Sequence, residues 1–126
     1  MTVAAEIGRS KYVSLTTYRR DGTGVATPVW HVLDGGELFI VSEAGAWKVK
    51  RIRNNSQVMV TVCDLRGKIA PGAPSAEGTA RLLDEAGTAT ARSLLARKYV
   101  LSRLGNWAAR ILRLRRPPVI GIAVRF

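Results

Sequence analysis

The chain has 126 residues, 47% of them hydrophobic and 23% charged, which fits one domain over residues 1–126 with an ordinary core and argues against intrinsic disorder. The formal net charge of +11 indicates an anionic partner, and nucleic acid, anionic lipid and a phosphorylated cofactor all qualify. No apolar run approaches the ~20 residues that span a bilayer, the lone Cys63 excludes an internal disulfide, and the lone His31 argues against a metal site.

The N-terminal stretch and the cysteine count indicate the compartment, and the charge is unevenly distributed along the chain. The stretch MTVAAEIGRSKYV has no basic leader followed by a long apolar run, so we expect no signal peptide. A single cysteine suits a reducing compartment, and we expect a cytoplasmic protein. Every acidic residue lies at or before Glu85, whereas basic residues continue to Arg125, so the C-terminal third is strongly positive.

The first part of the chain predicts an antiparallel meander. Residues 3–9 are compatible with a short helix. Three segments alternate and are rich in β-branched and aromatic residues, as strands are: residues 11–18, 25–33 and 37–42. Asp21-Gly22 and residues 34–36 supply the turns between them. Pro28 has no N–H to donate, so the second strand is expected to be an edge strand or to be bulged there.

The segment over residues 45–54 interrupts the β pattern. Val49 and Ile52 are three residues apart and give one narrow apolar stripe, which predicts a short helix. Four cations lie on it without an acid: Lys48, Lys50, Arg51 and Arg53. Like charges three residues apart repel, and cations in the first turn oppose the helix dipole. The segment is therefore expected to hold an anion such as a phosphate, with a solvated basic helix as the alternative.

The rest of the chain adds two strands, a helical region and a closing strand. Residues 57–64 alternate strictly, and residues 75–84 form a fifth strand in which Gly78 marks a bulge or a close approach. From about residue 87 the apolar period is helical, with Gly105-Asn106 separating two helices, before a last strand over residues 119–126. This order predicts a mainly β, six-stranded barrel, closed or partly closed, with a short helix after the third strand.

Five segments occur in an order that resembles a known family: VSLTTYRRDGTGVATPVW, KVKRIRNN, CDLRG, EGTARLLD and ARKYVLSRL. Together they resemble the split-barrel flavin and deazaflavin oxidoreductases of the pyridoxamine-phosphate-oxidase-like superfamily. The likeness is to the small actinobacterial branch described as coenzyme F420-dependent, and it covers nearly the whole chain. The resemblance implies a split β-barrel homodimer whose cofactor lies in grooves shared by the two protomers.

The resemblance also implies which residues contact the cofactor. The strand through Thr27, Pro28, Val29 and Trp30 corresponds to the strand whose backbone runs along the tricyclic ring. Ser42 stands where the family often has a hydroxyl group for the phosphate. Lys48 falls on the family's phosphate lysine, with Lys50 and Arg51 beside it. Trp47 departs from the family, in which many members have a small residue or arginine at that place.

Candidate catalytic residues are few. His31 follows the ring-side strand, so it is a candidate proton donor and substrate contact, with a surface histidine as the alternative. Trp47 and Tyr99 are candidate walls of the substrate pocket, whereas Trp107 better suits packing in the core or the dimer interface. Cys63 fits a small strand residue better than a nucleophile.

Three functions follow as expectations. The first is a reductase that passes a hydride from reduced coenzyme F420 to a planar conjugated acceptor such as a quinone, bilin, enone or nitroaromatic. The second is an FMN-binding oxidoreductase of the same fold. The third is a non-enzymatic basic module over residues 90–116 that binds anionic membrane or nucleic acid, although no nucleic-acid motif is present.

The sequence does not decide between several partners for the basic C-terminal region. Arg92, Arg97 and Lys98 either screen the negative tail of F420 or only solubilise a helix. The segment RILRLRR, residues 110–116, suits peripheral contact with the inner face of a membrane.

Overall fold

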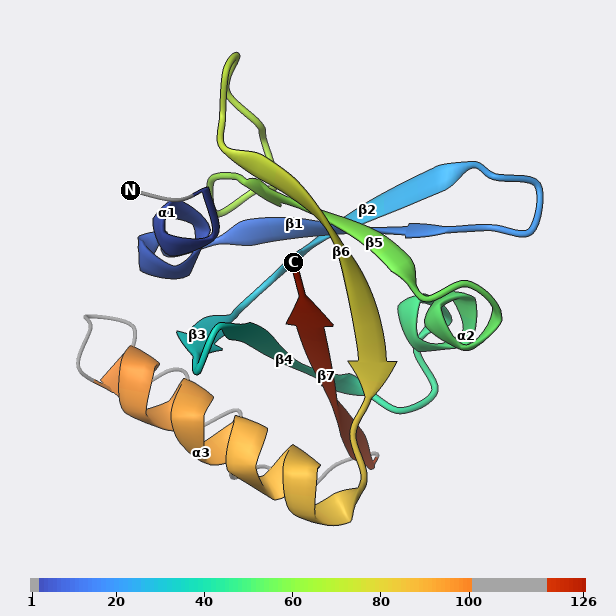
Figure 1. Ribbon diagram of the computed structural model, residues 1–126, viewed down its shortest axis with the longest axis vertical. Helices are drawn as coiled ribbons and strands as arrows, with labels where there is room; N and C mark the ends of the chain where they lie inside the picture. The colour runs from blue at the N-terminus through green and yellow to red at the C-terminus, as the bar shows by residue number, and fades with distance from the viewer. Residues whose placement is uncertain (1–2, 101–117) are drawn as a thin grey trace.

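The computed structural model describes residues 3–100 and 118–126, which form three helices and seven strands. Their bounds are α1 (Val3–Arg9), β1 (Val13–Tyr18), β2 (Gly24–Val29), β3 (Val32–Asp34), β4 (Glu37–Glu43), α2 (Trp47–Asn54), β5 (Gln57–Val62), β6 (Ser75–Leu82), α3 (Glu85–Val100) and β7 (Val119–Arg125). All the strands belong to one antiparallel sheet in the order β2-β1-β5-β6-β7-β4-β3. The sheet curls on itself, which gives the half-barrel of a split-barrel fold (Figure 1).

The two strands at the edges of the sheet are consecutive in the chain. β2 and β3 are joined by only Trp30 and His31, so the chain passes directly from one edge to the other. The sequence predicted one strand over residues 25–33 and hence six strands. That prediction was wrong in number, because the segment divides at these two residues and each half pairs with a different neighbour. The edge position predicted from Pro28 is confirmed.

The core lies inside the curl of the sheet, where alternate residues of each strand point inward. Its fully or nearly buried members come from α1, α2 and the strands: Ile7, Val13, Leu15, Leu38, Ile40, Val49, Ile52, Val58, Val60, Ala80, Ile122 and Val124. Gly78 meets this core with no bulge, since its pairing with Val58 lies within a continuous register. A Cβ on Gly78 would stand 2.7 Å from Val124 Cγ1, so the glycine permits close approach.

Helix α2 lies against β1 and β6 through the narrow apolar stripe that the sequence predicted. Val49 is 0% and Ile52 is 4% exposed, whereas the charged residues between them face outward. Burying two aliphatic side chains contributes about 3–6 kcal/mol, which offsets the mutual repulsion of the basic residues. The helix therefore owes its position to packing, and its cations are available for another task.

Helix α3 packs on the outer face of the sheet, over β4 and β7 (Figure 1). The backbone N–H of Gly121 donates to the hydroxyl of Thr88 at 2.9 Å. A Cβ on Gly121 would lie 3.2 Å from Thr88 Cα, so only glycine lets helix and strand come this close. Leu95 is 4% exposed and contacts Trp30, which ties the helix to the link between the two edge strands.

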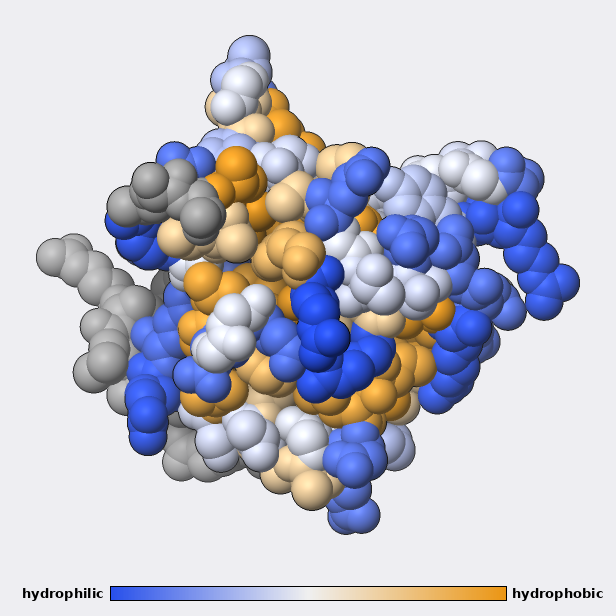
Figure 2. Space-filling model, viewed as in Figure 1, coloured by the Kyte–Doolittle hydropathy of each residue, from blue (hydrophilic) through white to orange (hydrophobic). Residues whose placement is uncertain are grey.

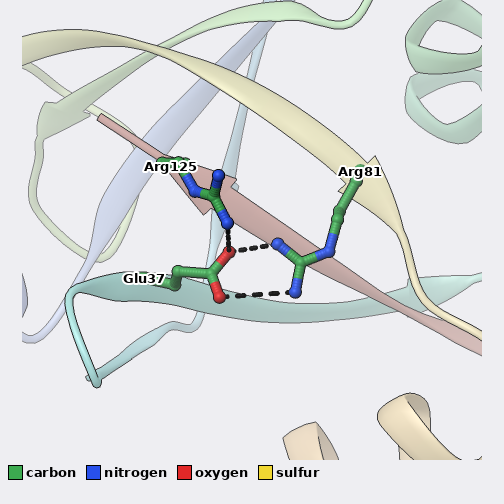
Figure 3. A network of polar contacts seen from close by, with 3 residues as sticks. All are labelled: Glu37, Arg81 and Arg125. Atoms are coloured by element: carbon green, nitrogen blue, oxygen red, sulfur yellow. Dashed lines mark hydrogen bonds and ion pairs between the residues drawn. The ribbon is translucent and has the colours of Figure 1, made fainter.

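A polar network joins three neighbouring strands on the exposed side of the sheet (Figure 3). Glu37 of β4 forms an ion pair with Arg81 of β6 and a longer one, at 4.0 Å, with Arg125 of β7. The hydrogen bond from Arg81 holds the pKa of the Glu37 carboxyl below its usual value. This network links side chains of β4, β6 and β7, which are neighbours in the sheet.

Within the described ranges, no helix is long and apolar enough to cross a membrane.

Candidate functional site

A groove of about 400 Å³ lies between the end of β2 and the passage from β4 into α2. Its lining comes from two segments that are distant in sequence: Pro28, Val29, Trp30, Val41, Ser42, Glu43, Ala46 and Lys48. Cofactor sites of ordinary size fall in this range of volume. The structure thus brings together the two segments that the resemblance assigned to the ring and to the phosphate of one cofactor.

Lys48 lines this groove and is half-buried. It forms no hydrogen bond or ion pair within the part of the chain that the structure describes. Burial lowers the pKa of its ammonium group, and the nearby Arg51 lowers it further, while Glu43 acts in the opposite direction. A cation held in this way is stabilised by any anion that enters the groove.

The N-terminus of α2 opens beside Lys48. Ala46, the N-cap residue, has extended backbone (φ −65°, ψ 150°) and no side chain caps the helix. The first intrahelical donor is the N–H of Val49, at 3.1 Å from the carbonyl oxygen of Ala46, so the N–H groups of Trp47 and Lys48 precede the helical ladder. No acid occupies the first turn. Free N–H groups and a positive dipole end favour a bound phosphate.

Ser42 and Thr27 present the other hydroxyl groups of the site. Ser42 is 8% exposed, and its hydroxyl donates to the carbonyl oxygen of Glu43 at 3.2 Å, so it must turn to donate to a phosphate. Thr27 lies on β2 outside the groove lining. Its hydroxyl oxygen is buried and has no hydrogen-bond partner within the described residues.

Lys50 and Arg51 lie in a neighbouring groove and not in the lining around Lys48. The ammonium group of Lys50 stands 4.4 Å from the centre of the Trp47 ring, a cation–π contact. Arg51 Nε donates to the hydroxyl of Thr17 at 2.7 Å. The Trp47 side chain is 70% exposed and also lines this second groove.

His31 was expected to face the groove, and the structure instead buries it completely, outside the lining of the groove. Its Nε2 lies 2.8 Å from the carbonyl oxygen of Ile7 and 3.2 Å from the hydroxyl of Ser10, so the Nε2–H tautomer donates to the helix end. Burial, with a smaller effect from Lys98, lowers the pKa of the imidazole to about 4. His31 is neutral at pH 7 and its Nε2–H is bonded to α1. It is therefore not placed to donate a proton to a substrate in the groove.

Lys98 completes this buried junction. Its ammonium group donates to the carbonyl oxygens of His31 at 2.8 Å, Ser10 at 3.1 Å and Gly8 at 3.3 Å. Burial lowers its pKa to about 8. The ammonium group of Lys98 already donates to three carbonyl oxygens of the fold. This argues against the expectation that Lys98 screens a cofactor tail.

Several other expected features fall outside the described residues. These are the Tyr99 side chain, Trp107, the Gly105-Asn106 break and most of the basic segment over residues 90–116. Cys63 is described and half-buried, and burial raises the pKa of its thiol, which does not favour a thiolate nucleophile. The described residues contain no cluster of three or more His, Cys, Asp or Glu side chains that could hold a metal ion.

The structure adds a residue that the sequence reasoning missed. Glu43 lines the groove and is the acid nearest in sequence to the phosphate lysine. Glu43 directly follows Ser42, the last residue of the third predicted strand. This position could have indicated from the sequence that it lines the site.

The chain was compared with known families and solved structures. The family model for pyridoxamine 5′-phosphate oxidase matches residues 2–121, almost the entire sequence. The chain belongs to this family. Its members share the split barrel found here, and the family membership expected from the ordered motifs is confirmed. None of the curated proteins matches the sequence.

Solved structures with the same fold have varied ligands. An F420 reductase is 23% identical, with 96% of this chain and 90% of that one covered and a TM-score of 0.64. An FAD-binding protein from Mesorhizobium loti is 16% identical, with coverages of 95% and 82% and a TM-score of 0.64. A haem storage protein from Vibrio cholerae is 14% identical, with coverages of 99% and 90% and a TM-score of 0.66. At these identities the likeness establishes the fold.

Proposed function

We propose that this protein is a reductase that uses reduced coenzyme F420 to transfer a hydride to a planar conjugated acceptor. The observation that carries the proposal is the groove in which Lys48 and the uncapped start of α2 face the end of β2. One end of this groove favours a phosphate, and the other end offers the apolar side chains of Pro28, Val29 and Trp30.

The phosphate end fits the chemistry of its ligand. A half-buried ammonium group with a lowered pKa and no partner among the described residues is stabilised by an anionic phosphate. The N–H groups that begin α2 add donors that are already oriented, so little ordering is needed when the anion enters. These features would hold the phosphate of F420 and that of FMN alike, so FMN remains the second candidate.

The ring end is built on an edge strand. Among the described strands, β2 has a neighbour on one side only, so its outer backbone N–H and C=O groups are open to hydrogen bonds with the polar edge of a flavin-like ring. Trp30, packed against Leu95 of α3, gives this wall a rigid apolar support. A rigid wall matters because hydride transfer requires the two rings to be held at near-attack distance.

The bound deazaflavin would supply the hydride, and the chain's own residues would bind and orient it. Among the described residues of the lining, only Glu43 and Lys48 are ionisable. Lys48 is committed to the phosphate, and Glu43 is exposed at the rim, so no proton donor is assigned to the lining. An acceptor that stacks on the ring, such as a quinone, bilin, enone or nitroaromatic, fits such a site.

A homodimer is part of the proposal. The groove is open along one side, and a second protomer would cover it and exclude water from the reacting rings. Light scattering tests this directly, because a strict monomer that still binds cofactor tightly contradicts a groove shared by two protomers.

Titration of the purified protein with F420 and with FMN tests the cofactor. We expect micromolar or tighter binding of F420, weaker binding of FMN, and a loss of at least about tenfold, or about 1.4 kcal/mol, in Lys48→Gln. Lys68→Gln is the matched control, since Lys68 is an exposed lysine in the loop between β5 and β6.

The outcomes separate the candidates. Equal or tighter binding of FMN makes the protein an FMN oxidoreductase of the same fold. Binding that is equally weakened in Lys48→Gln and Lys68→Gln assigns the effect to net charge and removes the phosphate site. No binding of either cofactor rejects the enzymatic proposal and favours the non-enzymatic basic module.

A further inference from the structure

A second groove, of about 570 Å³, lies between the β1–β2 turn and the exposed face of α2. Its lining consists of Tyr18, Arg19, Arg20, Trp47, Lys50, Arg51 and Asn54. It shares none of these residues with the groove around Lys48. The proposed cofactor site therefore leaves this surface without a task.

The lining of the second groove is strongly basic and contains no acid. Figure 2 shows hydrophilic side chains gathered over the β1–β2 turn and α2 at the right of the view. Asp21, in the turn, interacts with Arg19 and offsets part of its charge, while its carboxylate accepts a hydrogen bond from the Thr23 N–H at 2.9 Å. Arg20, Lys50 and Arg51 form no ion pair within the described residues.

Two of these cations are held in place before any ligand arrives. The hydrogen bond from Arg51 Nε to Thr17 leaves the terminal nitrogens of the guanidinium group to donate elsewhere. The ammonium group of Lys50 stands over the Trp47 ring, which favours its position in the lining of the groove. Cations ordered next to one another without a counter-charge are the arrangement that a multiply charged anion stabilises.

Aromatic rings accompany the charge. Tyr18 lines the groove, and its ring passes Gly24 at a place where a Cβ would stand 3.3 Å from Tyr18 Cε1. Trp47 is 70% exposed, so the ring face that Lys50 does not cover is open to a planar ligand. A planar group stacked there would recover apolar contact that the free protein leaves in water.

We propose that this groove binds a small polyanion that carries a planar ring, of the nucleoside diphosphate or triphosphate class. The concave shape and the volume suit one such molecule better than a flat lipid surface. A longer nucleic acid strand would need a continuous basic track, yet the adjoining groove beyond Tyr18 is lined by Asn55, Gln57 and Glu77. The proposal does not depend on the identity of the cofactor at Lys48.

Calorimetric titration of the full chain with ADP, pyrophosphate and adenosine tests the proposal. We expect ADP to bind more tightly than pyrophosphate, and adenosine to bind weakly or not at all. The double variant Arg20→Gln/Lys50→Gln should lower ADP affinity at least about tenfold. Trp47→Leu should lower ADP affinity about fivefold and pyrophosphate affinity clearly less, because it removes the stacking surface as well as the ring that orders Lys50.

Two control variants test whether ADP binds in the second groove. Arg66→Gln/Lys68→Gln removes the same charge from the exposed β5–β6 loop and should leave ADP affinity unchanged. Lys48→Gln should weaken cofactor binding and leave ADP binding intact, so failure of this proposal and failure of the cofactor proposal give different results. Circular dichroism of each variant confirms that the exposed substitutions leave the fold intact.

Four results would overturn the proposal. Equal losses in the two double variants would mean that ADP responds only to net charge. Loss of ADP binding in Lys48→Gln would move it to the first groove. Equal affinity for ADP and pyrophosphate in the unsubstituted protein would remove the planar ring from the proposal. The fourth result is that the protein binds no ADP but binds anionic vesicles or single-stranded oligonucleotides in a way that depends on Arg20 and Lys50. That result would show that the groove contacts a macromolecule.

Discussion

Two partly buried lysines of this protein stand in opposite situations. Lys98 closes the junction of α1, α3 and the β2–β3 link and donates to three backbone carbonyl oxygens. Lys48, at the start of α2, forms no hydrogen bond or ion pair among the described residues. Burial lowers the pKa of both ammonium groups. A partly buried cation with internal partners contributes to the fold, whereas one without them remains available to an external anion.

The closed junction is expected to respond most strongly to acid, through His31. Its pKa is lowered to about 4 in the folded protein from 6.5, so the unfolded chain binds the proton first as the pH falls. Stability is therefore complete above pH 6.5 and is lost between 6.5 and 4, by about 3 kcal/mol in total. Urea unfolding at a series of pH values measures this loss.

His31→Gln provides the control for the acid effect. The glutamine amide can still donate to the carbonyl oxygen of Ile7 but does not titrate, so the variant should show a much smaller change in stability over the same pH range. Parallel pH profiles for the two proteins would show that carboxylates elsewhere, and not the imidazole, cause the acid sensitivity.

The next effect compares the two lysines by the same substitution. Lys98→Met leaves three carbonyl oxygens without their donor and should lower the free energy of unfolding by about 2 kcal/mol. Lys48→Met removes a half-buried charge that has no internal partner, so it should leave stability unchanged or raise it slightly. Denaturant unfolding at pH 7 of the two variants beside the unsubstituted protein makes the comparison. Equal losses in both would contradict the distinction between a structural and a binding lysine.

The smallest effect concerns the acid at the rim of the groove. Glu43→Gln removes a negative charge near the proposed phosphate position, so F420 or FMN should bind about two- to fivefold more tightly. Glu77→Gln, on an exposed position of β6, is the matched control and should leave the affinity unchanged. If both variants bind the cofactor more tightly, and the gain in affinity falls equally with added salt, the effect arises from the net charge of the protein and not from the position of Glu43.

Much of the fold was predictable because each signal was local. Val49 and Ile52 predicted α2, strict alternation predicted β5, and the missing N–H of Pro28 predicted an edge strand. The division between β2 and β3 was not predictable, because residues 25–33 read as one continuous strand. The two halves pair with different neighbours, and His31 between them is buried against α1, which are contacts between residues distant in sequence.

The candidate site was predictable in part for a similar reason. The resemblance assigned Ser42, Lys48 and β2 to one site, and the structure brings Ser42 and Lys48 together with the end of β2 in one groove, although their contact with a cofactor stays a prediction. Lys50 was expected beside Lys48, yet residues two apart on a helix point to nearly opposite sides, so helical geometry alone argued against it. The hydrogen bond of Arg51 to Thr17 depends on how α2 packs against β1, which the sequence does not reveal.

The short link between the two edge strands gives the molecule one more property. A single peptide bond connects Trp30, which forms a wall of the open groove, to His31, which is locked beneath the first helix. A displacement of the Trp30 backbone would be expected to disturb the hydrogen bond between His31 Nε2 and the carbonyl oxygen of Ile7. Helix α1 is thereby joined to the wall of the groove through a link of two residues, although it lies about forty positions before Lys48 in the sequence.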